Sequence, residues 1–184
     1  MQADFRKFKR RPFFLPLLMP VALLAVVVAA AIWLLDARVS TVVVLVRNAE
    51  VEQSLVANPG LNELGKARAN ALLQLLERAK PGRAVDAVYA IESVPAQQTA
   101  APLAAKMGIA VNVLATGGST SQLSHIRDNH AGEVVLVVAS RDKLLALLHE
   151  VGDQDWLIDE LDYGSIFVVT QSRLSKPAVI RLKY

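Results

Sequence analysis

The chain has 184 residues, of which 53% are apolar, and a formal net charge of +3. This length suits one domain with an appendage, and the absence of cysteine excludes disulfide bonds and thiol chemistry. Five basic residues and one acidic residue lie within the first eleven positions, so the rest of the chain carries a net charge of about −1. A globular part without a basic surplus argues against nucleic-acid binding.

A long apolar segment follows a basic tail at residues 1–12. The 24 residues between Arg11 and Asp36 contain no charge, and about 20 apolar residues are enough for a helix to cross a bilayer. We therefore predict one transmembrane helix at residues 13–35, followed by a linker at 36–40. Because basic residues collect on the cytoplasmic side, the N-terminus is expected in the cytoplasm and the folded part on the other side.

The same segment has a second interpretation, as a signal peptide that is removed. Ala29 and Ala31 form the small-residue pattern that precedes a cleavage site. The apolar run continues past them to Leu35, however, and Trp33 suits an anchor at the membrane interface. We therefore favour the uncleaved anchor.

Beyond the linker, residues 41–184 alternate between strand and helix patterns. Short apolar runs predict six strands, at 41–46, 85–91, 109–114, 133–139, 166–170 and 178–182. Apolar residues at helical spacing predict helices at 62–76, 95–107 and 143–151. The segment 116–122, rich in Gly, Ser and Thr, predicts a loop. This order predicts an α/β fold, a three-layer α/β/α sandwich with a mostly parallel central sheet.

The first of these strands ends abruptly in polar residues. Its sequence, TVVVLVRNAE at Thr41–Glu50, places them where ligands bind in open α/β sheets. This ending resembles the Arg-His-Ala/Gly-Glu signature of the histidine phosphatase (phosphoglycerate mutase-like) superfamily, with Asn48 in place of the histidine. Further blocks resemble the short exported members of that superfamily in the same order: Pro59–Ala69, Asp86–Ala90 with Ala96–Ala100, Val134–Ala139 with Arg141–Lys143, and Asp162–Val169 with Arg181–Tyr184.

The resemblance implies which positions would form the active site. The superfamily uses one histidine to attack phosphorus, while two arginines and a second histidine hold the phosphate oxygens. A neutral imidazole is a good nucleophile, and fixed cations stabilise the charge of the transition state. The matching positions in this chain are Arg47, Asn48, Pro95 and Ser140, so only the first arginine is kept. Because the amide nitrogen of Asn48 has no lone pair for attack, no catalytic residue is expected.

We therefore interpret the chain as a membrane-anchored, catalytically inactive pseudophosphatase, with its domain in the bacterial periplasm. Its expected partners are the membrane, through residues 13–35, and either a phosphorylated or anionic small ligand or an envelope protein. Arg47, Asn48 and Ser140 are the candidate anion-binding residues, although Arg47 could equally bond loop carbonyls. No cofactor, metal or nucleic acid is expected.

Two other functions stay open from the sequence. The first is an active phosphomonoester hydrolase with a non-standard nucleophile such as Ser140, which would need a base beside it. The second is a structural component of an envelope assembly, which would use the fold as a scaffold.

The remaining polar candidates are interpreted as structural. The three histidines, His125, His130 and His149, are expected on the surface or in helix packing and not as metal ligands, the first two flanking a loop. Glu50 and Glu92 follow predicted strands and are interpreted as solvated loop carboxylates. Trp156 would either fill the vacated pocket or pack elsewhere, and the sequence does not decide between these.

Overall fold

The computed structural model describes residues 15–37, 39–77, 84–114, 121–152, 156–172 and 175–184. The chain forms two compact units, Met1–Arg38 and Val39–Tyr184. The predicted basic tail at residues 1–12 lies outside the described residues.

The first unit contributes one helix, α1 (Leu15–Ala37). All side chains described on it, from Met19 to Leu34, are exposed, and its apolar residues are spread around the whole circumference. The helix continues to Ala37, so it includes the first two residues of the predicted linker. Within the described part of the chain, no helix combines the length and the apolar character needed to cross a membrane.

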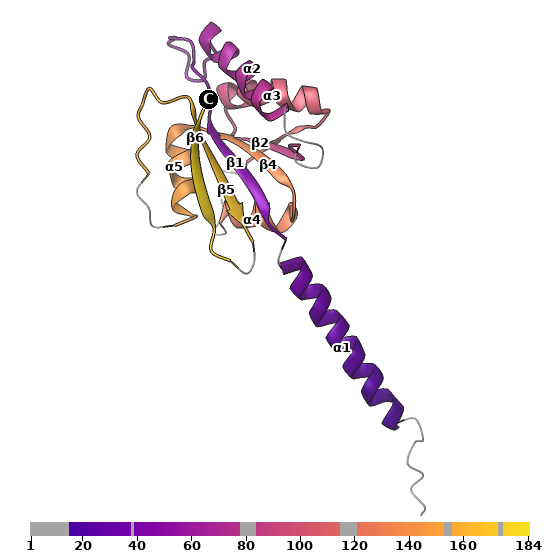
Figure 1. Cartoon of the computed structure of the whole chain (residues 1–184). Helices are drawn as coiled ribbons and strands as arrows, with labels where there is room; N and C mark the ends of the chain where they lie inside the picture. Colours follow the sequence, from indigo (N-terminus) through magenta and orange to yellow (C-terminus); the bar gives the residue numbers. More distant parts are fainter. Residues whose placement is uncertain (1–14, 38, 78–83, 115–120, 153–155, 173–174) are drawn as a thin grey trace, which may run out of the picture. The chain divides into compact units, whose positions relative to one another are not determined.

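The second unit is built on a six-stranded sheet with the order β3-β2-β4-β1-β5-β6 (Figure 1). The first four strands in this order are parallel, β5 is antiparallel to β1, and β6 is antiparallel to β5. The α/β prediction is confirmed, and the sheet is mixed because an antiparallel hairpin closes one side. The strands are β1 (Thr41–Arg47), β2 (Ala87–Ala90), β3 (Val111–Val113), β4 (Val134–Ala139), β5 (Ser165–Gln171) and β6 (Ala178–Lys183).

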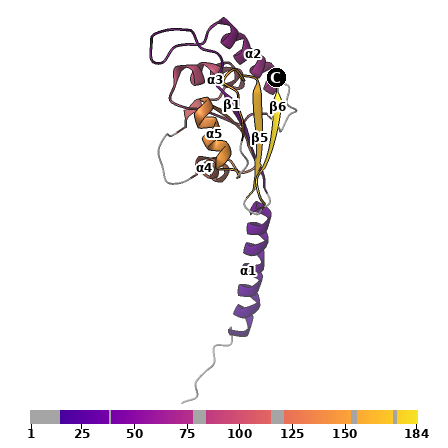
Figure 2. The ribbon, with the colours of Figure 1, turned by 90° about the vertical axis from the view of Figure 1, so that its left-hand side faces the viewer.

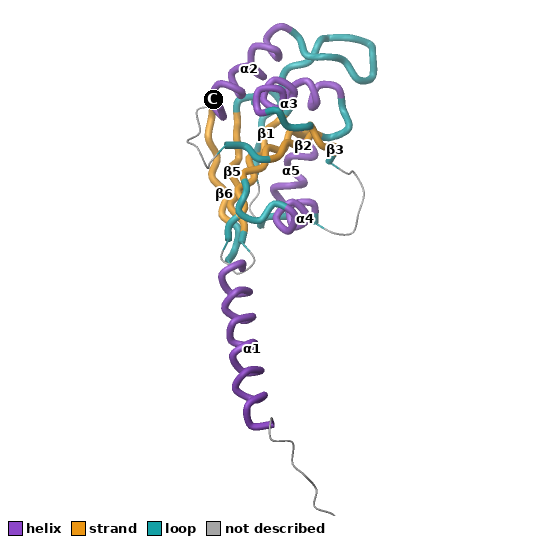
Figure 3. The backbone as a smooth tube through the Cα atoms, turned by 90° about the vertical axis from the view of Figure 1, so that its right-hand side faces the viewer, coloured by secondary structure: helices purple, strands orange, loops and turns teal. Residues whose placement is uncertain are grey.

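Helices cover both faces of this sheet, as the two side views show (Figures 2 and 3). Side chains of β1 alternate between the two faces, because successive strand residues point to opposite sides. Val43 and Leu45 belong to the hydrophobic cluster that includes residues of α4 and α5, whereas Val44 and Val46 belong to the cluster of α2 and α3. The helices are α2 (Glu63–Glu77), α3 (Val94–Met107), α4 (Gln122–Asn129) and α5 (Arg141–His149).

Helix α4 was not predicted from the sequence. Only two of its side chains, Leu123 and Ile126, are buried, and they give too short an apolar pattern to be recognised. The expectation that His125 and His130 flank a loop is therefore wrong. His125 lies on α4, and His130 is its C-terminal cap, with Nδ1 2.7 Å from Glu133 and Nε2 2.8 Å from the Tyr89 hydroxyl.

Candidate functional site

The carboxyl ends of β1 and β4 lie side by side. Arg47 is paired with Ala139, and the Asn48 N–H donates to the Ala139 carbonyl over 2.8 Å. Asn48 and Ser140, the residues that follow the two strands, are therefore neighbours at this edge. The register places two of the positions predicted for the site at the same edge of the sheet.

Pro95 is linked to this edge by hydrogen bonds of the Thr99 hydroxyl group. It is buried in the first turn of α3, the helix that follows β2. The Thr99 hydroxyl donates to the Pro95 carbonyl over 2.7 Å and accepts from the Ala49 N–H over 3.0 Å. The first turn of α3 is therefore bonded to the residue after Asn48.

Arg47 uses its guanidinium to hold the loop that precedes β5. Its Nη1 donates to the carbonyl of Asp159 over 3.3 Å and to that of Glu160 over 2.6 Å. The guanidinium carbon lies 4.0 Å from the centre of the Tyr163 ring, at cation–π distance. These contacts are the loop-carbonyl bonds that the sequence left as the alternative to anion binding.

Two more arginines bond carbonyls of the same loop. Arg141 Nε donates to Ile158 over 2.9 Å, and Arg181 Nη1 donates to Leu157 over 3.1 Å. Four consecutive carbonyls, those of residues 157–160, thus accept from guanidinium groups of three separate elements. We call this segment the arginine-bound loop.

Trp156 packs beside this loop against the sheet. Its ring lies edge-on to Phe167 of β5, with the centroids 5.3 Å apart and the planes at 84°. Trp156 thereby joins the hydrophobic cluster on the α4–α5 face. Of the two positions that the sequence left open, it therefore takes the one in ordinary packing.

The side chains of Asn48 and Ser140 have local structural partners. Asn48 Nδ2 donates to the neighbouring Ala49 carbonyl over 3.0 Å. Ser140 is the N-cap of α5, and its Oγ accepts from the Lys143 N–H over 3.4 Å. An amide cannot act as a nucleophile toward phosphorus, and a serine hydroxyl needs a base to become one.

Glu50 forms an ion pair that sequence reasoning missed. Arg68 of α2 donates through Nε and Nη2 to both carboxylate oxygens, at 2.6 to 2.9 Å. The Glu50 side chain is only 12% exposed, so its interpretation as a solvated carboxylate is wrong. Burial raises the pKa of Glu50, but the Arg68 bonds and charge, together with a backbone bond, outweigh burial and lower it overall.

Helix α2 can pack closely enough against the chain at Glu50 to form this ion pair because Gly65 has no side chain. A Cβ at Gly65 would collide with the Glu50 carbonyl. Tyr184 lies near the pair; burial raises its pKa to about 12, and its hydroxyl has no hydrogen-bond partner among the described residues. Glu92, by contrast, is exposed in the described structure, as the sequence predicted for it.

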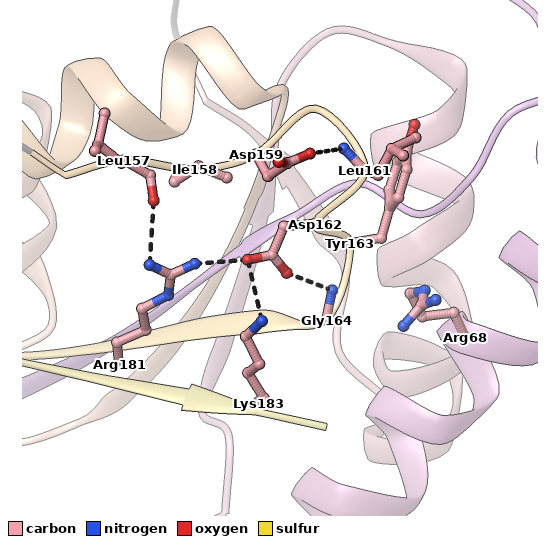
Figure 4. A pocket seen from close by; sticks show the side chains of 10 residues that line it. All are labelled: Arg68, Leu157, Ile158, Asp159, Leu161, Asp162, Tyr163, Gly164, Arg181 and Lys183. Carbon is pink, nitrogen blue, oxygen red and sulfur yellow. Dashed lines mark hydrogen bonds and ion pairs between the residues drawn. The ribbon is translucent and has the colours of Figure 1, made fainter.

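A pocket of about 770 Å³ lies between the arginine-bound loop and the end of β6 (Figure 4). At its centre Asp162 accepts from Arg181 over 2.6 Å and lies 3.8 Å from the Lys183 amine. None of the four positions predicted for the active site lines it. Its lining residues are Arg68, Leu157, Ile158, Asp159, Leu161, Asp162, Tyr163, Gly164, Arg181 and Lys183.

Comparison of the sequence finds no matching family model and no matching curated protein. Solved structures do resemble the chain. The protein histidine phosphatase SixA, complexed with tungstate, superposes with a TM-score of 0.62 over 77% of this chain and 96% of its own, at 14% identity. A putative phosphohistidine phosphatase SixA from Agrobacterium tumefaciens gives 0.57 over 78% and 98%, at 21% identity. The chain has the histidine phosphatase fold.

A mycobacterial glucosyl-3-phosphoglycerate phosphatase in complex with VO3 shares this histidine phosphatase fold. Its TM-score is 0.58 over 78% of this chain and 98% of its own, at 13% identity. At such identities the likeness concerns the fold and does not carry over an activity. The fold that the resemblance implied is confirmed, and the functional roles of Arg47, Asn48, Pro95 and Ser140 stay predictions.

Proposed function

We propose that this protein is a catalytically inactive member of the histidine phosphatase fold that works by binding. The observation that carries the proposal is the residue after β1, where the superfamily's nucleophilic histidine is matched by Asn48. Its amide donates to the Ala49 carbonyl and offers no lone pair to phosphorus. None of the four matched positions, all of them in the described part of the chain, offers an imidazole to accept a phosphoryl group.

The other positions support the same proposal. Ser140 caps α5, and Pro95 has no charge to hold a phosphate oxygen. Arg47 is the one cation kept, and it already bonds two carbonyls and faces Tyr163. A phosphate there would have to compete with these bonds, so the anion binding proposed for Arg47, Asn48 and Ser140 is weak.

We also propose that the domain is anchored in the inner membrane and faces the periplasm. The proposal rests on the uncharged stretch at residues 13–35 and on the five basic residues before it. A helix that is apolar on all sides, as α1 is, is suited to lipid or to a protein core and not to water. The proposed span begins at Phe13, outside the described residues.

Phosphatase turnover tests the loss of catalysis. All three hydrophobic clusters of the domain lie within residues 39–184, so this unit can be assayed without α1, with an aryl phosphate as substrate. We expect no turnover by the wild type and a gain by the triple variant Asn48→His, Pro95→Arg, Ser140→His. Turnover by the wild type would reject the proposal in favour of an active hydrolase.

A binding isotherm with inorganic phosphate tests the anion site separately. We expect weak binding that Arg47→Ala abolishes. Arg141→Ala is the matched control, because it removes a bond to the same loop without changing the end of β1. Identical isotherms for the wild type and Arg47→Ala would show that Arg47 does not bind the anion.

A further inference from the structure

Among the described strands, none pairs with the outer side of β6. It is the last strand in the sheet order, and the Tyr184 N–H donates to the Gly164 carbonyl on the β5 side over 3.0 Å. Because hydrogen-bonded pairs alternate along an antiparallel ladder, Val179, Arg181 and Lys183 direct their N–H and C=O groups away from β5. An additional strand can bind to these groups. We call this row the β6 edge.

The pocket of Figure 4 lies at the carboxyl end of this edge, since Arg181 and Lys183 line it. Two of its other lining residues are exposed leucines, Leu157 at 86% and Leu161 at 85%. Among the large apolar residues described in the domain, only Leu55 is more exposed. Two leucines this exposed beside one pocket offer an apolar contact to a partner.

The backbone beside these leucines is held in place. The carbonyl of Leu157 accepts from Arg181, and the next three carbonyls accept from Arg141 and Arg47. The Leu161 N–H donates to the Asp159 carboxylate over 2.8 Å. A partner that binds a surface already fixed loses less conformational entropy, which favours affinity.

The charges at the β6 edge argue against a second copy and for an acidic partner. Arg181 and Lys183 lie on neighbouring outward positions, and two such edges would bring like charges together, which opposes pairing. The Lys183 side chain is 72% exposed, and its amine lies 3.8 Å from Asp162, so it can contact an added carboxylate. Of the three cations that line the pocket, Arg68 is paired with Glu50 and Arg181 with Asp162, so Lys183 is the one most open to a partner's carboxylate.

We propose that the β6 edge binds an extended acidic segment of a partner protein as a seventh strand. An acidic side chain of that segment pairs with Lys183, and an apolar one contacts the exposed leucines beside the pocket. This inference identifies the surface through which the protein would bind a partner, so it rests on the binding role proposed above. It does not rest on the loss of catalysis.

A tethered strand tests this proposal without knowledge of the natural partner. Residues 39–184 are extended after Tyr184 by a Gly/Ser linker and the segment Val-Glu-Thr-Leu-Val, whose Glu and Leu share one face of the added strand and which a short tether holds at an effective concentration of about 1 mM. The matched control carries Val-Lys-Thr-Leu-Val. We expect the acidic segment to slow amide exchange of Val179, Arg181 and Lys183 by about tenfold or more, and the basic segment to leave it unchanged.

Single substitutions assign the contacts within this test. Lys183→Glu should abolish the protection by the acidic segment, whereas Lys176→Glu, an exposed lysine before β6, should keep it. Leu161→Ser should reduce the protection, and Leu55→Ser, at a still more exposed leucine elsewhere, should not.

Two results would overturn the proposal. One is equal protection, or none, from the acidic and basic segments. The other is slow amide exchange at the β6 edge in the protein without an added segment, if that protection increases with protein concentration. Such a result would assign the β6 edge to a second copy. Turnover of an aryl phosphate would reject the proposed function and leave these exchange results unaffected, so the two failures are distinguishable.

Discussion

Two loops beside the carboxyl ends of the parallel strands differ in how they are held. The loop at residues 51–60 is fixed near its two ends, where the Glu52 N–H donates to the Gly60 carbonyl, Asn62 Nδ2 donates to the Val51 carbonyl, and Asn58 Oδ1 accepts from the Val94 N–H. The arginine-bound loop is fixed along its length by guanidinium groups. Both expose a leucine almost fully, Leu55 in one and Leu157 in the other.

This difference shows that exposure alone does not describe a binding surface. A leucine in the middle of a loop that is held only near its ends loses more freedom when a partner binds it. A leucine on a loop held at each carbonyl has less backbone freedom to lose. The variants below perturb the base of the first loop and then the bonds of the second.

Gly65→Ala should have the largest effect, because it acts on the backbone that leads into the loop at 51–60. The added Cβ would collide with the Glu50 carbonyl, and the backbone would have to shift. We expect a loss of about 2–3 kcal/mol in the free energy of unfolding, measured by urea denaturation. Gly152→Ala, where a Cβ meets no atom of the described residues within 4 Å, is the control and should be neutral.

Glu50→Gln should have the next largest effect and should depend on pH. At pH 7 it leaves the half-buried Arg68 without its anion, at an expected cost of about 2 kcal/mol in unfolding free energy. The folded-state pKa of Glu50 lies below its ordinary value of 4.5. The pair therefore stabilises the protein fully above that value, and its contribution is lost as the pH falls through the folded-state pKa.

Urea denaturation of the wild type and the variant between pH 7 and pH 3 checks this expectation. The difference between the two proteins should shrink as the pH falls. Glu63→Gln is the control, since its side chain is 90% exposed in the pair with Lys66 and should not matter. A difference that stays constant down to pH 3 would contradict the assigned role of Glu50.

Arg47→Ala should have the smallest effect on stability and a local effect on exchange. It removes two bonds to the carbonyls of Asp159 and Glu160, which solvent can partly replace, so we expect a cost of about 1 kcal/mol. Amide exchange at residues 157–161 should accelerate, while exchange at residues 51–60 stays unchanged. Faster exchange in both loops would show that they are not held independently.

Most of the sheet could be predicted from the sequence, for a physical reason. β1 and β4 are buried on both faces, so their apolar residues form continuous runs that end at polar residues. Arg47, Asn48 and Ser140 lie where those runs end, and this placed them at the carboxyl edge of the sheet, as the register of β1 and β4 shows. α4 escaped prediction because it buries only Leu123 and Ile126.

The contacts around that edge could not be predicted, because their partners carry no sequence signal. Arg47, Arg141 and Arg181 bond main-chain carbonyls, which every residue has. The pair of Glu50 and Arg68 depends on how closely α2 packs against the chain after β1, and Gly65 is the one local indication of that approach.

The position of β1 in the sheet order also determines when the domain can form. β1 is made first, yet its neighbours are β4 and β5, so Val42 pairs with Val134 and Val46 with Ile166. Pairings between residues so distant in sequence form slowly, because a long loop must close first. While the ribosome completes the later strands, the run TVVVLV stays without partners, and an unpaired apolar strand is prone to aggregate. Folding of this domain therefore begins only after most of it has been synthesised, and a chaperone that shields β1 would raise its yield.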